Sequence, residues 1–304
     1  MRGADLGRLL FLAALWGFSF IFIRIAAPAL GPIVLVAFRV LIAGLILLVY
    51  ARITHARLEI KARWKQYLMI GALGSAIPFV LISTAELHLP ASLAAILNAT
   101  TPLFGAVIAA LWIEDALTPA KVAGLVLGVL GVSIVVGWSP LELSGIVMLS
   151  IGASLLAAAF YGLSGVFTKV KAAGARPVGM AVGSQLGAAL LLIPLVPFAL
   201  PNSRPSVVVV LCFLALAVLC TALAYLIYFR LIVDVGPTKA LTVTFLVPVF
   251  AVAWGAIFLA EPLTGGAALG CAVVLAGTAL VTGVRVRPLW RAVTAKATRS
   301  GRPL

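Results

Sequence analysis

Long apolar runs separated by short polar segments fill almost the whole chain. Eight runs of 20 to 27 residues contain no Asp, Glu, Lys or Arg, and two earlier runs, 9–29 and 32–51, contain one arginine each. A helix that crosses the hydrocarbon core of a bilayer needs about 20 mostly apolar residues. We therefore predict an all-α integral membrane protein with ten transmembrane helices. The eight charge-free runs are 66–85, 89–113, 122–141, 143–168, 177–203, 205–229, 240–260 and 262–284.

The second half of the chain repeats the first. Residues 90–136 are echoed by residues 236–282, and Pro102 corresponds to Pro248 at an offset of 146. In the same alignment Glu114 and Glu261 correspond only if one extra residue is allowed. A repeat of this length in an apolar chain indicates a duplicated membrane unit, the architecture with which many transporters build a site between two halves.

The repeat also covers the first helix of each copy, because Trp16 aligns with Tyr161 at an offset of 145. Each copy then holds five helices, and an odd number places the second copy upside down in the membrane. We expect two inverted five-helix repeats at 1–139 and 140–284, followed by a basic cytoplasmic tail at 285–304.

Composition and charge agree with a membrane protein. Hydrophobic residues make up 64% of the 304, charged residues 10%, and the net charge is +14. Most basic residues lie between the apolar runs and fall on one side of the predicted topology, so membrane orientation explains them better than nucleic-acid binding. The positive-inside rule predicts that both termini are cytoplasmic.

The sequence resembles the EamA family of the drug/metabolite transporter superfamily. The resemblance is carried by "LWGFSFIFIR" in the first helix, "FRVLIAGLILL" in the second, and "TPLFGAVIAALWIEDAL" and "VPVFAVAWGAIFLAEPL" near the end of each half. It implies a transporter of five plus five helices in the cytoplasmic membrane of a prokaryote. Such proteins are commonly exporters of amino acids or other small metabolites.

Arg39 is the charge that lies deepest in a predicted span. An intramembrane charge is costly and is by default a functional hypothesis, here a counter-ion for a substrate carboxylate. The alternative is an arginine that reaches outward to the interface or donates to helix-end carbonyls.

Polar residues and prolines interrupt corresponding helices of the two halves. Asn98 and Thr101 share a helix face beside Pro102, and Thr244 precedes Pro248 in the second copy. A pair of proline-interrupted helices points to a transport site, with Asn98 and Thr101 binding substrate and the two prolines gating. The prolines otherwise only bend the helices for packing.

Aromatic and amide side chains complete the predicted substrate site: Trp16, Tyr161, Gln185 and Tyr225. Trp16 and Tyr161 are repeat-equivalent and lie several residues inside their helices, so they are expected to line a cavity between the halves. Interfacial anchoring is the usual alternative for Trp and Tyr.

Acidic residues near the helix ends are expected to have structural roles. Glu114, Asp115 and Glu261 are interpreted as caps for the next helix or as salt bridges at a gate. Glu86 and His88 are placed at a plain interfacial position, with titration at the outer surface as the alternative.

Several classes of function are disfavoured by what the sequence lacks. There is no GxxxxGK[ST] motif for ATP, and the two histidines are predicted on opposite sides of the membrane, so no catalytic triad or metal cluster can form from them. We predict no enzyme and no cofactor, but a secondary transporter that exports a small metabolite by alternating access. The partners are a small-molecule substrate and the lipid bilayer, with no nucleic acid, and a homodimer stays open. The alternative is a non-transporting scaffold or a lipid-handling protein.

Overall fold

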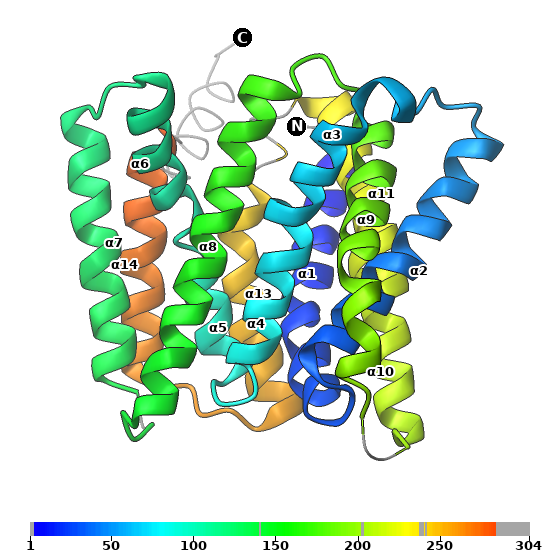
Figure 1. Cartoon of the computed structure of the whole chain (residues 1–304). Coiled ribbons are helices and arrows are strands. Elements are labelled where there is room, and N and C mark those ends of the chain that lie inside the picture. The colour runs from blue at the N-terminus through cyan, green and yellow to red at the C-terminus, as the bar shows by residue number, and fades with distance from the viewer. Residues whose placement is uncertain (1–2, 140, 202–203, 237–239, 241, 284–304) are drawn as a thin grey trace, which may run out of the picture.

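A computed structural model describes residues 3–139, 141–201, 204–236, 240 and 242–283. Over these residues the protein is all-helical, and its helices run back and forth through one bundle (Figure 1). The basic tail expected at 285–304 lies outside the described residues.

The first half of the chain supplies five passes through the bundle (Figure 1). The third pass is α3, η1 and α4 in direct succession, and the fourth is α5 followed by α6. The elements are α1 (Gly3–Leu30), α2 (Pro32–Ile53), α3 (Ile60–Gly71), the π-helix η1 (Ala72–Ala76), α4 (Ile77–Ala85), α5 (Ala91–Asn98), α6 (Thr101–Ile113) and α7 (Pro119–Gly137).

The second half supplies five more passes with a similar division into elements. They are α8 (Gly145–Lys171), α9 (Pro177–Leu192), the 3-10 helix η2 (Ile193–Phe198), α10 (Val207–Ala217), the π-helix η3 (Val218–Leu223), α11 (Ala224–Val235), α13 (Val243–Leu259) and α14 (Gly265–Thr282). Among the described residues, nine passes are long and apolar enough to cross a membrane, and α13 is a shorter apolar helix of 17 residues. The all-α membrane fold predicted from the hydrophobic runs is confirmed.

The helix starts follow from ordinary capping chemistry. Hydroxyl side chains accept a hydrogen bond from a backbone N–H three residues later at the start of four helices, which supplies one of the missing partners there. The capping residues are Thr118 of α7, Ser144 of α8, Ser206 of α10 and Thr264 of α14. Thr118 and Thr264 are again 146 residues apart, so the two copies share this signal.

Two passes depart from the uninterrupted helices predicted at 89–113 and 177–203. The first breaks at Ala99 and Thr100, between α5 and α6. The second tightens into η2 from Ile193, a segment that contains two prolines. Proline lacks a backbone N–H and crowds the preceding turn, which explains why a regular α-helix does not continue there.

The pairs of helices that lie closest use glycine at their contacts. A Cβ atom on Gly124 would lie 2.5 Å from the carbonyl oxygen of Gly277, and one on Gly131 would lie 2.7 Å from the backbone nitrogen of Val274. The absence of side chains at these positions therefore lets α7 and α14 approach each other closely.

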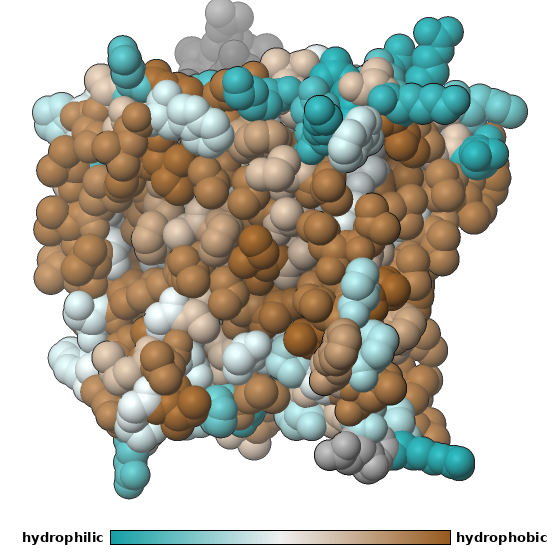
Figure 2. Space-filling model, in the orientation of Figure 1, coloured by the Kyte–Doolittle hydropathy of each residue, from teal (hydrophilic) through white to brown (hydrophobic). Residues whose placement is uncertain are grey.

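The face of the bundle seen in Figure 2 is mainly apolar across its middle and polar at both ends. Exposed large side chains such as Leu111, Val129 and Leu149 contribute to this surface. We call the end where α1 begins the N-terminal end. The opposite end, where α4 ends and α5 begins, is called the Glu261 end, because the Glu261 carboxylate contacts α5 there (Figure 1).

Candidate functional site

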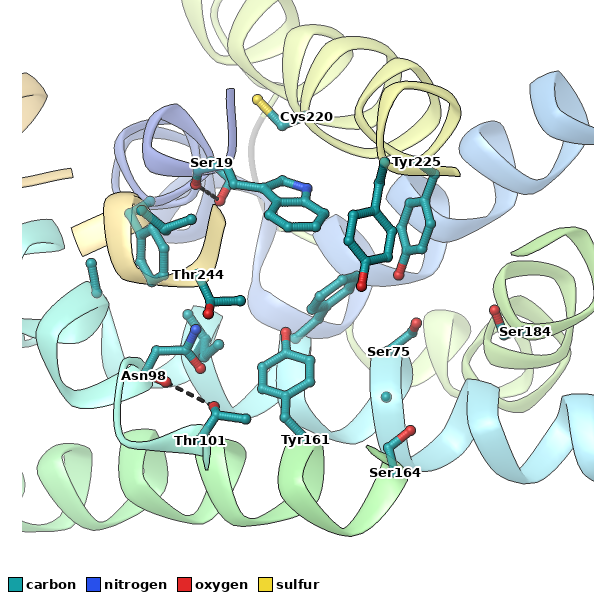
Figure 3. A pocket seen from close by; sticks show the side chains of 18 of the residues that line it. Ser19, Ser75, Asn98, Thr101, Tyr161, Ser164, Ser184, Cys220, Tyr225 and Thr244 are labelled. Carbon is teal, nitrogen blue, oxygen red and sulfur yellow. Dashed lines mark hydrogen bonds between the residues drawn. The ribbon is translucent and has the colours of Figure 1, made fainter. Parts of the chain in front are cut away.

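A cavity of about 400 Å³ lies within the bundle, and helices from both halves of the chain line it (Figure 3). Its wall is mainly apolar and aromatic, with several hydroxyl and amide groups directed inward. This is the usual make-up of a small-molecule site. The labelled side chains in Figure 3 are Ser19, Ser75, Asn98, Thr101, Tyr161, Ser164, Ser184, Cys220, Tyr225 and Thr244.

Arg39 of α2 is the one charged residue among the described residues that line the cavity. Its side chain is buried, with 4% of the residue exposed. Nε donates to Oγ1 of Thr221 at 2.9 Å, and the guanidinium carbon lies 3.9 Å from the centre of the Phe79 ring. Arg39 thus neither reaches the interface nor donates to helix-end carbonyls, and its charge is held at the cavity wall.

Gln185 of α9 occupies the position equivalent to Arg39, at the offset of 146. Its Nε2 donates to the Ser75 hydroxyl at 3.0 Å. Gln185 is completely buried and is not among the cavity-lining residues, whereas its neighbour Ser184 is. The prediction that Gln185 contacts substrate is therefore not supported by its position, which is behind the cavity wall.

These two hydrogen bonds are reciprocal between the halves. Arg39 of the first half donates to Thr221 in η3, and Gln185 of the second half donates to Ser75 in η1. Both acceptors lie in π-helical segments at equivalent positions. A π-helix adds a residue to the turn, shifts the side chains that follow and recurs at functional sites.

Asn98 lies at the end of α5, where the fourth pass breaks. Its Oδ1 is buried in the cavity region without a hydrogen-bond partner among the described residues. The Thr101 hydroxyl does not donate to this oxygen, because it donates to the backbone carbonyl of Asn98 at 2.8 Å. The Asn98 side chain is thus free to accept a hydrogen bond from a ligand (Figure 3).

The two prolines are not equivalent in the structure. Pro102 is in the first turn of α6, just after the break at Ala99 and Thr100, whereas Pro248 lies inside the continuous helix α13. The prediction of two proline-interrupted helices is wrong for α13 because its turns continue past Pro248. Both prolines still line the cavity.

The repeat-equivalent pair Trp16 and Tyr161 contributes to the cavity wall, and so does Tyr225. Trp16 packs against Tyr228, with ring centres 5.4 Å apart, and Tyr161 meets Phe79 edge-on at 6.2 Å. Each of the two predicted aromatics is therefore supported by another ring.

Sequence reasoning missed Phe79, Ser164 and Ser184, which also line the cavity. Phe79 offers no polar signal in an apolar helix, and single serines are common in membrane spans. Ser184 is adjacent to Gln185, which the sequence analysis chose. Only the rotation of α9 about its axis decides that Ser184, and not Gln185, lines the cavity.

Two segments of the chain, residues 7–137 and 145–283, match the EamA-like transporter family. Together they cover nearly the whole chain. The protein belongs to the EamA-like transporter family. The resemblance inferred from the sequence is thereby confirmed, and the family points to a transporter and not to an enzyme.

Two curated relatives of this EamA-like protein are similar over nine-tenths or more of their length. The uncharacterized transporter YvbV of Bacillus subtilis (strain 168) is 27% identical over 278 residues, which cover 90% of each chain. A probable amino-acid metabolite efflux pump of Salmonella typhimurium (strain LT2) is 24% identical over 293 residues, covering 91% of this chain and 95% of the pump. A crystal structure with 18% sequence identity has a TM-score of 0.66 and covers 99% of this chain and 100% of that one, a likeness of fold.

The acidic residues of the EamA-like protein correct one detail of the repeat. Glu114 and Ala260 both have a left-handed backbone, with φ of 54° and 53°, at the constant offset of 146. The structural counterpart of Glu261 is therefore Asp115, and no extra residue is needed. Each follows the left-handed residue that ends its helix.

Asp115 and Glu261 have different partners at the two ends of the bundle. Asp115 pairs with Nζ of Lys121 at 2.7 Å, and this hydrogen bond and charge lower the pKa of Asp115. Glu261 accepts hydrogen bonds from the backbone N–H of Ala91 at 2.7 Å and of Ser92 at 3.0 Å. Glu261 is thus a helix cap, as expected, but it caps α5 of the other half and not the next helix.

Proposed function

We propose that this protein is a secondary carrier that exports a small metabolite bearing a carboxylate, an amino acid or a close relative of one, by alternating access. The substrate binds in the central cavity, and the halves rock to expose it to each side in turn. The carrier lies in the cytoplasmic membrane with both termini in the cytoplasm. The name of the Salmonella relative supports the substrate class, and the family supports transport itself.

The observation that carries the substrate class is the charge of the cavity wall. Arg39 contributes one positive charge, and the described lining residues include no carboxylate. A carboxylate that enters the cavity gains a charge-assisted hydrogen bond, whereas a cation gains no opposite charge. The unpaired Oδ1 of Asn98 offers an acceptor for a neighbouring amino group.

The size and lining of the cavity fit the same class. About 400 Å³ is at the small end of the range for metabolite sites. Aromatic rings such as Trp16, Tyr161 and Tyr225 provide apolar surface for the rest of the molecule.

Unequal burial along the cavity supports alternating access. Toward the Glu261 end, the lining residues Ile23, Ile82 and Ala95 are 3%, 4% and 1% exposed. Toward the N-terminal end, the lining residues Thr168 and Met180 are only half-buried. This pattern is that of a carrier closed at the Glu261 end, and inverted repeats provide a route to the opposite state.

Counterflow of labelled amino acids in proteoliposomes tests the proposal, with Arg39→Gln as the decisive variant. We expect saturable exchange in the wild type and a loss of about 10- to 100-fold in Arg39→Gln, because a hydrogen bond to a charged group contributes roughly 1.5–3 kcal/mol. Arg176→Gln, which removes an exposed arginine at the N-terminal end, is the matched control and should transport normally.

Two outcomes contradict this function. Normal exchange by a folded Arg39→Gln protein would show that Arg39 does not bind the substrate. If a broad metabolite screen gives neither flux nor a ligand-induced rise in thermal stability, the non-transporting scaffold is favoured.

A further inference from the structure

Glu86, in the connection between α4 and α5, is the most unusual polar group outside the cavity. The sequence placed it at the interface, but the residue is 0% exposed, and neither Oε1 nor Oε2 has a hydrogen-bond partner among the described residues. The interfacial interpretation is therefore wrong, because neighbouring residues of the protein enclose the Glu86 side chain completely. A buried carboxylate without hydrogen bonds is strongly disfavoured relative to the neutral acid.

The charged groups that face Glu86 come from α1, α2 and the segment after α13. They are Arg24, Arg39 and Glu261. Nη1 of Arg24 donates to the backbone carbonyls of Glu86 and Leu87 and not to the carboxylate. The guanidinium of Arg39 is held by Thr221 and Phe79.

Glu261 and Glu86 are two neighbouring carboxyl groups in contrasting environments. The Glu261 carboxylate accepts two backbone N–H bonds at the start of α5, whereas the Glu86 carboxyl has no hydrogen-bond partner among the described residues. Burial, followed by the negative charge of Glu261, raises the pKa of Glu86 well above its ordinary value. Glu86 therefore favours its neutral, protonated form.

The same contact joins the two halves. Glu261 belongs to the second repeat and α5 to the first, and the Glu261 carboxylate fits beside Gly255, where a Cβ atom would lie 2.6 Å from Oε2. Opening the Glu261 end separates this carboxylate from α5. It also brings water to the connection that carries Glu86.

We propose that Glu86 is a proton-binding site whose occupancy is linked to the closure of the Glu261 end. With this end closed, Glu86 holds one proton. When it opens, the O–H bond breaks, the electron pair stays on the carboxylate and water takes the proton. The site itself stands on the geometry of the closed state, and only the link to opening rests on the proposed alternating access.

Infrared spectroscopy of the purified full chain in lipid tests the site without any substrate. At pH 7 we expect the wild type to show a protonated carboxyl band that Glu86→Gln lacks. Glu142→Gln, which changes an exposed acid in the connection before α8, should keep the band. A wild type without the band, or a band unchanged in Glu86→Gln, overturns the proposal, and the first result needs no variant to fold.

Hydrogen exchange of α5, measured by mass spectrometry between pH 6 and pH 9, tests the link. The raised pKa belongs to the closed state, so closure is favoured at low pH and weakens as the pH rises through that value. We expect opening of α5 relative to Glu86→Gln at the same pH to increase by up to about tenfold per pH unit as the pH approaches the raised pKa from below, and to level off above it. A wild-type to variant ratio that stays constant with pH overturns the link. Because neither measurement involves a metabolite, failure of the transport assay leaves both results interpretable.

Discussion

Arg39 and Gln185 occupy the same helix position in the two copies and differ in chemistry, but they donate to hydroxyls at equivalent positions. Each donates to a hydroxyl in the π-helix of the other half, Thr221 or Ser75. The hydrogen bond holds a charge at the cavity wall in one case and a neutral amide behind the wall in the other. The shared hydrogen-bond geometry therefore orients both side chains. The difference between arginine and glutamine gives the cavity wall its positive charge.

Removing the acceptors should separate the two roles. In Thr221→Val, the buried guanidinium loses its partner, which we expect to cost roughly 1.5–3 kcal/mol and to reduce exchange of carboxylate substrates. In Ser75→Ala, a neutral amide loses its partner, at about 1 kcal/mol. Thermal unfolding of the two purified variants should show a larger loss of stability in Thr221→Val than in Ser75→Ala.

The matched control for Thr221→Val is Thr282→Val, whose exposed hydroxyl bonds only to its own helix. It should leave both stability and exchange unchanged. Equal stability of Thr221→Val and the wild type would show that the guanidinium does not depend on Thr221.

At the scale of elements, α7 and α14 make the most extensive helix–helix contact among the described residues. Gly124 of α7 faces Gly277 of α14, and Gly131 faces Gly270, so each glycine of α7 meets the repeat counterpart of the other. In lipid no hydrophobic effect drives helices together, so close backbone approach and van der Waals packing provide the association.

Gly131→Ala tests this packing, because close helix contact predicts that the added methyl group lowers the stability of the protein. Its Cβ would lie 2.7 Å from the Val274 nitrogen and 3.0 Å from the Gly270 carbonyl oxygen, so the helices must separate. We expect a loss of about 1–3 kcal/mol, as for other overpacked sites. Gly152→Ala on α8 meets no atom within 4 Å and should be neutral or stabilising.

Thermal unfolding in one lipid or detergent measures both glycine variants. A melting temperature of Gly131→Ala equal to that of Gly152→Ala would show that the contact between α7 and α14 accommodates a methyl group without loss of stability.

At the scale of the whole molecule, the two ends of the bundle differ although the halves are repeats. Glu261 bridges the halves by capping α5, whereas its counterpart Asp115 pairs with Lys121. These unequal contacts of equivalent residues agree with the proposed carrier whose Glu261 end is closed.

Replacing the bridging carboxylate should shift this balance. In Glu261→Gln the cap loses its charge at the start of α5, which we expect to weaken closure by about 1 kcal/mol, or roughly fivefold in the population of the closed end. Faster hydrogen exchange at the start of α5, with unchanged exchange in α14, is the expected result. Protection of α5 equal to the wild type contradicts a role for Glu261 in closure.

Much of the architecture was predictable because the bilayer constrains it directly. Spanning runs of about 20 apolar residues, capping hydroxyls at Thr118 and Thr264, and the repeated prolines and glycines are all local signals. Site residues were predictable where a polar or aromatic side chain was out of place in a span, as Arg39 and Asn98 are. Phe79 has no such signal, whereas Pro102 indicated the break that the structure places at Ala99 and Thr100.

By itself, the sequence determined the family, the membrane class, the duplication and the positive charge inside one half. The family follows from the resemblance of the quoted motifs, and the other three features follow from hydrophobic runs, charge and the alignment of the two copies. Only the tertiary structure decided that Gln185 lies behind the wall, that Glu86 is buried and unpaired, and that Glu261 caps α5. Those features depend on helix rotation and on contacts between segments as much as 170 residues apart, which no local pattern encodes.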